Sequence, residues 1–147
     1  MDDDATPPAL LRTLPSWLLN RAALTATRVV ADHLAVLGLR RSHFPVLLTL
    51  DEAGPLSQAG LGRRLDLDRS DLHAIVGDLE ELGLVERRRD PADRRANSLR
   101  LTASGRATLK RAMSAVLAAQ DDLLAPLSER EREQLARLLA RVVDARA

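Results

Sequence analysis

A chain of 147 residues has room for one domain, or for two small lobes that share a core, and it needs no metal or disulfide to fold. It contains no cysteine, which excludes disulfides, thiolate metal sites and thiol-based redox sensing. Its first residues are acidic where a signal peptide would be basic, and no stretch approaches the ~20 apolar residues of a membrane span. We therefore expect a soluble, cytoplasmic protein with no membrane partner.

The composition favours packed helices, because leucine and alanine dominate and the only aromatic residues are Trp17 and Phe44. The net charge of +1 says nothing about nucleic acid, but the distribution of charge does. Between residues 87 and 100, six arginines stand against two aspartates. Attraction to phosphate needs such a local basic patch and not a high total charge.

The first third of the chain predicts an arm and two helices. Residues 1–12 are acidic and contain prolines, so we expect a loose arm there. Apolar residues at helical spacing predict a helix over residues 15–37. A second helix is predicted to begin at Arg41 or Ser42 and to end before Gly54.

The next two predicted helices are short and lie close together in the sequence. Ser57 is placed to cap a third helix over residues 58–65, and Asp68 to cap a fourth helix that Gly83 ends. Two short helices joined by a turn of this length make a helix-turn-helix. The inward residues are expected to be Leu61, Leu65, Leu72, Ile75, Val76 and Leu79.

The hydrophobic period then changes from helical to alternating. Residues 84–88 and 98–102 are predicted to form two strands joined by a loop at residues 90–93. A hairpin that directly follows a helix-turn-helix is a wing, and the arginines of this one have no purpose in an ordinary connecting loop.

Two further helices complete the predicted fold. One covers residues 102–124 and is broken by Pro126, and the last is opened by a capping box of Ser128 and Glu131. The last helix is expected to bury Leu135, Leu138, Leu139 and Val142. Because the terminal helices have apolar faces but few partners within one chain, an intertwined homodimer is predicted to cover them.

Residues 90–105, which contain the run Asp-Pro-Ala-Asp-Arg-Arg, closely resemble the wing and the following helix start of the MarR (multiple antibiotic resistance regulator) family. Residues 68–87 resemble the recognition helix of that family and its exit. The implied fold is mainly α with a small β wing. We divide the chain into an arm and dimerisation helix (1–38), a winged helix-turn-helix (39–102) and C-terminal dimerisation helices (103–147).

The resemblance implies a transcription regulator and not an enzyme: a homodimeric repressor that binds a pseudo-palindromic operator in double-stranded DNA. Its recognition helices would enter successive major grooves, while each wing reaches a minor groove. The candidates for contact with base edges are Ser70, Asp71, His73 and Ala74. The candidates for contact with phosphates or the minor groove are Ser57, Arg63, Arg64, Arg69, Arg87, Arg88, Arg94 and Arg95.

The sequence departs from the family pattern at Gly77 and Asp78, where a basic residue is common. Affinity is therefore expected to depend heavily on the wing. Relatives released from DNA by small aromatic acids suggest a further site for an effector, and its candidates are Trp17, Arg21, His33, Arg40, His43 and Phe44. The alternative is that the two aromatic residues are ordinary core and the histidines are surface or capping residues.

Three other interpretations compete with this one. A zinc-responsive regulator would use His33, His43 and a carboxylate such as Asp32, but the histidines lack metal-ligand spacing. An enzyme is disfavoured because no nucleophile elbow, phosphate loop or dinucleotide fingerprint occurs, so no cofactor or metal is expected. A winged helix that binds protein instead of DNA would suit the acidic recognition helix, while the wing argues against it.

Overall fold

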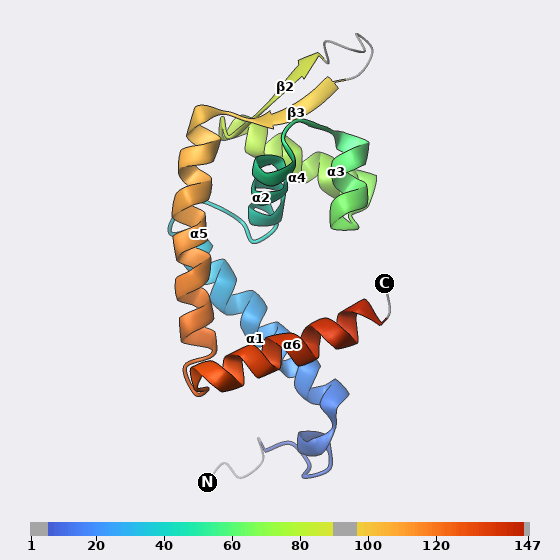
Figure 1. Ribbon diagram of the computed structural model, residues 1–147, viewed down its shortest axis with the longest axis vertical. Coiled ribbons are helices and arrows are strands. Elements are labelled where there is room, and N and C mark those ends of the chain that lie inside the picture. Colours follow the sequence, from blue (N-terminus) through green and yellow to red (C-terminus); the bar gives the residue numbers. More distant parts are fainter. Residues whose placement is uncertain (1–5, 90–96, 146–147) are drawn as a thin grey trace. The chain divides into compact units, whose positions relative to one another are not determined.

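The computed structural model describes residues 6–89 and 97–145, which fall into two compact units (Figure 1). The central unit comprises residues 30–116, and the terminal unit comprises residues 1–29 and 117–147. The predicted winged helix-turn-helix, residues 39–102, lies inside the central unit. The three-part division of the chain remains a prediction.

The central unit contains the helices and strands predicted for a winged helix-turn-helix, and one strand that was not predicted. In chain order the elements are α2 (His43–Ala53), β1 (Leu56–Ser57), α3 (Gln58–Leu65), α4 (Arg69–Glu81), β2 (Val85–Arg89) and β3 (Asn97–Leu101). Helix α3 has the predicted bounds, and Ser57 caps it as expected, with its Oγ accepting the Gly60 N–H at 3.1 Å. Helix α2 begins at His43, later than the predicted start at Arg41 or Ser42.

The sheet is antiparallel, with the strand order β1-β3-β2. Val85 pairs with Leu101 in the hairpin, and Leu56 of β1 pairs with Leu99 on the other side of β3. A strand of two residues is too short to show an alternating pattern, which is why the sequence did not predict β1. The strand forms by pairing with β3. It attaches the start of α3 to the wing.

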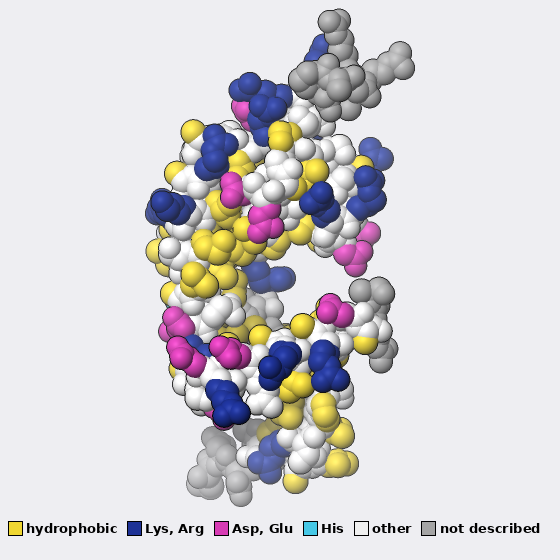
Figure 2. All heavy atoms as spheres, in the orientation of Figure 1, with side chains coloured by type: hydrophobic (Ala, Val, Ile, Leu, Met, Phe, Trp, Pro, Cys, Tyr) yellow, Lys and Arg dark blue, Asp and Glu magenta, His cyan; other side chains and the backbone are white. Residues whose placement is uncertain are grey.

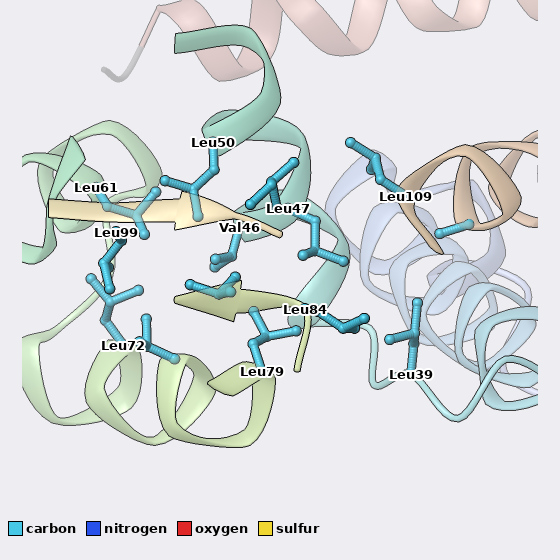
Figure 3. Close-up of a cluster of buried hydrophobic side chains, with 14 of the residues drawn as sticks. Leu39, Val46, Leu47, Leu50, Leu61, Leu72, Leu79, Leu84, Leu99 and Leu109 are labelled. Carbon is cyan, nitrogen blue, oxygen red and sulfur yellow. The ribbon is translucent and has the colours of Figure 1, made fainter. Parts of the chain in front are cut away.

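The hydrophobic core of the central unit is made almost entirely of leucine and valine (Figure 3). Side chains from α2, α3 and α4 meet those of β2 and β3, and Leu109 of α5 (Ala103–Leu123) joins them. Leu61, Leu72, Val76 and Leu79 are buried as predicted, while Leu65 and Ile75 are half-buried at its edge. Full burial of such a side chain contributes about 1.5–3 kcal/mol, so burial of this cluster is a large favourable contribution to the folding of the unit.

The start of α5 is joined to the turn between α4 and β2 by three hydrogen bonds of Thr102. Its Oγ1 donates to the Gly83 carbonyl at 2.7 Å and accepts the Gly105 N–H at 2.9 Å, and its own N–H donates to the Leu84 carbonyl at 3.1 Å. A Cβ on Gly105 would overlap the Leu84 carbonyl oxygen, so only glycine permits this approach. We call this contact the α5 joint.

The terminal unit contains a 3-10 turn at Leu11–Thr13, most of one helix, the end of a second and the whole of a third. These are α1 (Pro15–Ala35) and α5, each of which continues into the central unit, and α6 (Glu129–Asp144). The expectation of a loose arm over residues 1–12 is partly wrong, because its end forms this 3-10 turn. The Thr13 hydroxyl donates to the Leu10 carbonyl at 2.8 Å. The predicted capping box of α6 is confirmed, with the Ser128 N–H donating to the Glu131 carboxylate at 2.8 Å.

Helix α6 is amphipathic but has no buried residue within the chain. Its apolar residues stand at the surface among arginines, as Figure 2 shows, with Leu138, Leu139, Val142 and Val143 between 36% and 66% exposed. Leu135 is half-buried. Within the described parts of the chain, no helix combines the length and apolar character needed to cross a membrane.

Candidate nucleic-acid interface

The first half of α4 presents the four base-edge candidates on an exposed surface. Asp68 is the N-cap of the helix and has extended backbone angles, although its side chain makes no capping hydrogen bond. Leu72 and Val76 are buried, and this fixes which way the helix faces. Ser70, Asp71, His73 and Ala74 are consequently all exposed. Periodicity predicted the buried face of the helix, whereas these four candidates came from the resemblance to the MarR family.

A groove of about 890 Å³ runs between α3 and the start of α4. It brings together four of the predicted contact residues, Arg63, Arg69, His73 and Arg87, above a floor that includes Gly62 and Leu72. The left-handed turn residue Asp66, with φ of 51°, lines the same groove. Three guanidinium groups around one concave surface favour an anionic partner such as a phosphate backbone. In the view of Figure 2, arginines stand out from the central unit with acidic side chains between them.

Arg87 and Arg88 lie on opposite faces of β2, because successive strand residues alternate. Arg87 reaches the groove, and its Nε donates to both Glu80 carboxylate oxygens at 2.9 and 3.2 Å. The Arg88 Nε pairs with Glu86, next but one along the strand, at 2.8 Å. The structure therefore brings Arg87, and not Arg88, to the groove beside Arg69.

The remaining phosphate candidates are placed differently. Arg64 is exposed on α3 but does not line the groove. The Ser57 hydroxyl oxygen accepts the Gly60 N–H as the cap of α3, an interaction that does not use the O–H with which a serine donates to phosphate. Arg94 and Arg95, the predicted minor-groove residues, lie outside the described residues.

Asp78, which departs from the family pattern, is turned towards the start of α2. Its Oδ2 lies 2.7 Å from Nη1 of Arg40 and 3.5 Å from Nε2 of His43. His43 is 2% exposed, and burial lowers the pKa of its imidazole although the Asp78 carboxylate opposes the shift. No local sequence pattern reveals this cluster, because Asp78 is 35 residues from His43.

The effector candidates are divided between the two units. Trp17 and Arg21 belong to the terminal unit, where the guanidinium carbon lies 5.6 Å from the centroid of the indole ring. The other four belong to the central unit: Phe44 packs at the edge of the core, His43 and Arg40 are in the Asp78 cluster, and His33 is half-buried. Among the described residues, no three histidine or carboxylate side chains come together as a metal site would require.

A helix-turn-helix followed directly by an antiparallel hairpin defines a winged helix-turn-helix protein. Residues 37–96 match the profile of the MarR family. The transcriptional repressor Rv2887 of Mycobacterium tuberculosis strain H37Rv is 31% identical over 126 residues, which cover 86% of this chain and 91% of the repressor. The chain belongs to the MarR family of transcription regulators.

Two solved structures with DNA have the same fold. The repressor CouR bound to a 23-mer DNA duplex is 33% identical with a TM-score of 0.86, covering 94% of this chain and 98% of that one. The complex of Rv2887 with DNA, described as a MarR family protein, is 29% identical with a TM-score of 0.75, covering 88% and 98%. The predicted family and fold class are confirmed.

Proposed function

We propose that this protein is a cytoplasmic repressor that binds a pseudo-palindromic operator in double-stranded DNA as a homodimer. The observation that carries the proposal is the exposed first half of α4 beside a groove lined by three arginines. Relatives of the same fold have been solved in complex with DNA. Ser70, Asp71, His73 and Ala74 would read base edges, which alone carry sequence information in the major groove.

Phosphate contacts supply affinity and register. Arg63, Arg69 and Arg87 line the groove, and we assign phosphate contacts to them and to Arg64. Arg94 and Arg95 remain proposed minor-groove residues, since a narrow A·T-rich groove attracts arginine. Because the Glu80 carboxylate bonds to Nε of Arg87, the terminal amines of that guanidinium are the groups we expect to meet DNA.

The homodimer is supported by the uncovered apolar face of α6, which a second copy would cover. Two recognition helices on one face of DNA lie about 34–36 Å apart, so the half-sites should be about 10–10.5 base pairs apart. Sedimentation should give a dimer at micromolar concentration, and footprinting should show two half-sites. A stable folded monomer, or one unpaired half-site, would contradict this assembly.

Substitutions in the wing and substitutions in the recognition helix should affect DNA binding in different ways. Replacing Arg94 and Arg95 with alanine should weaken binding to every duplex and flatten the plot of log affinity against log salt by about 0.9 for each phosphate that is no longer neutralised. Replacing Ser70 or His73 should instead cost about 1–3 kcal/mol at one or two base positions, with little change in salt slope. Unchanged binding of the double variant to random DNA would favour a winged helix that binds protein.

We also propose that a small aromatic or phenolic ligand releases the protein from DNA. Support comes from the terminal unit, where Arg21 and Trp17 offer a cation beside an aromatic face. Trp17 is the only tryptophan, so its fluorescence reports directly on this site. Salicylate should change that emission and dissociate a labelled duplex over the same concentration range. Dissociation without any change in emission would exclude Trp17 from the site.

A further inference from the structure

Two acidic side chains in the second half of the recognition helix α4 pair with residues of neighbouring parts of the central unit. Asp78 pairs with Arg40 and faces His43 at the start of α2, and Glu80 pairs with Arg87 of β2. The Asp78 cluster differs from an ordinary surface ion pair because His43 is buried, while the Arg40 side chain is 73% exposed. Both ring nitrogens of this buried side chain face polar partners, as is usual for a buried polar group.

The hydrogen bonds of His43 define which ring nitrogen carries the proton. The Arg40 backbone N–H donates to Nδ1 at 3.1 Å, so Nδ1 is an acceptor and bears no hydrogen. The proton of the neutral ring is then on Nε2, which faces Asp78 Oδ2 at 3.5 Å. Burial favours this neutral form, because it lowers the pKa of His43. The ring thus connects the backbone before α2 to a carboxylate of α4.

The position of Asp78 on its helix relates this cluster to the exposed surface of α4. Asp71 and Asp78 are seven residues apart, and about two turns of helix place them on the same stripe. A rotation of α4 that moves Asp78 away from α2 therefore turns Asp71 and its exposed neighbours by the same angle. The side chains that we expect to read bases depend on that angle.

We propose that His43 is a positioning residue, which acts through Asp78 to fix the rotation of the recognition helix and so the discrimination between operator and random DNA. This inference rests on the proposed function. It predicts that removing the interaction between His43 and Asp78 lowers the ratio of operator affinity to random-DNA affinity. The affinity for random DNA should fall much less than the affinity for the operator.

The test compares two conservative variants, each of which keeps one bond of the imidazole. The amide of His43→Gln can occupy the place of Nε2 and donate to Asp78, whereas the amide of His43→Asn can occupy the place of Nδ1 and accept from Arg40. The probes are a duplex selected from a random library by the wild-type protein and a scrambled duplex of the same composition. Affinities are measured at a temperature at which each variant is folded by circular dichroism.

We expect His43→Gln to keep the selectivity of the wild type and His43→Asn to lose about tenfold, which is comparable to the effect of one base contact. Retained selectivity in His43→Asn, or an equal loss in both variants, would overturn the proposal, since α2 capping or simple bulk would then explain the residue. If the wild type selects no duplex and binds none, the proposed function itself fails and takes this inference with it.

A second pair of variants decides the question if the histidine variants do not fold. Asp78→Ala and Glu81→Ala each remove one negative charge from the same helix, and Glu81 is exposed in its last turn. The loss of charge should raise affinity for the scrambled duplex to a similar extent in both variants, and in Glu81→Ala it should raise affinity for the selected duplex equally. Only Asp78→Ala should lower the ratio, by about tenfold. An equal ratio in the two variants would refute the positioning role.

Discussion

Replacing Gly105 with alanine tests the α5 joint. The added Cβ would overlap the carbonyl oxygen of Leu84, and a backbone atom cannot rotate out of the way as a side chain can. The start of α5 therefore has to move. That movement stretches the hydrogen bonds by which Thr102 holds Gly83, Leu84 and Gly105.

The size of the effect follows from these two contributions. Overpacking in a close-packed region costs about 1–3 kcal/mol. Loss of a hydroxyl cap at a helix start costs about 1 kcal/mol. The free energy of unfolding should therefore fall by about 2–4 kcal/mol, and at about 2–4 °C per kcal/mol for a chain of this size the melting temperature should fall by about 4–16 °C.

Scanning calorimetry at one fixed protein concentration measures this loss. Gly77→Ala is the matched control, because a Cβ at Gly77 meets nothing within 4 Å and alanine in a helix interior should add about 1 kcal/mol. Thr102→Val removes the two hydroxyl bonds without adding bulk at Gly105, so it should cost less than Gly105→Ala. If Gly105→Ala melts with the wild type, α5 is not held by this joint and the reasoning is wrong.

Three further predictions concern helix ends. Ser57→Ala should lower the free energy of unfolding by about 1 kcal/mol in urea titrations, and Ser57→Asp should keep most of it because a carboxylate can accept the same N–H; equal loss would contradict the cap. The hydrogen bond from the Ser128 N–H lowers the pKa of Glu131 below its ordinary value of 4.5. The stabilisation of α6 by the Glu131 carboxylate should therefore be complete above pH 4.5 and should be lost as the pH falls through the lowered pKa. The difference in helicity between wild type and Glu131→Gln should disappear over the same pH range. Arg132 donates to the carbonyls of Leu124 and Leu127, each at 3.1 Å, and to the Asp121 carboxylate, and a lysine cannot make all three contacts. Arg132→Lys should therefore speed amide hydrogen exchange in the first turn of α6. The control Arg137→Lys should leave exchange unchanged.

The elements with strong local signals could be predicted from the sequence. The cap at Ser57 and the capping box at Ser128 need only neighbouring residues, and the structure has both. Burial of Leu72 and Val76 followed from helical periodicity, and with it the exposed face of α4. The separation of Arg87 from Arg88 could also have been predicted, because strand alternation alone places them on opposite faces.

Features that depend on distant partners could not be predicted in the same way. Strand β1 has two residues, and it forms only because Leu99 and Ser98 of β3 are positioned to pair with it. Asp78 looked like a weakness of the recognition helix, since no local pattern joins it to His43. The α6 pattern indicated an amphipathic helix correctly, but a period cannot name the surface that covers it.

The two structural contacts of Ser57 affect how mutations at its codon should be interpreted. Its backbone pairs with Ser98 in the sheet of the wing, while its side chain caps α3. A screen for alleles that lose repression would therefore recover changes at this codon even if the side chain never meets DNA. Such alleles would map a defect in assembly of the wing and α3 together. Arg63 and Arg69 are exposed side chains that line the groove, and phenotypes of substitutions there would test the proposed contacts with DNA.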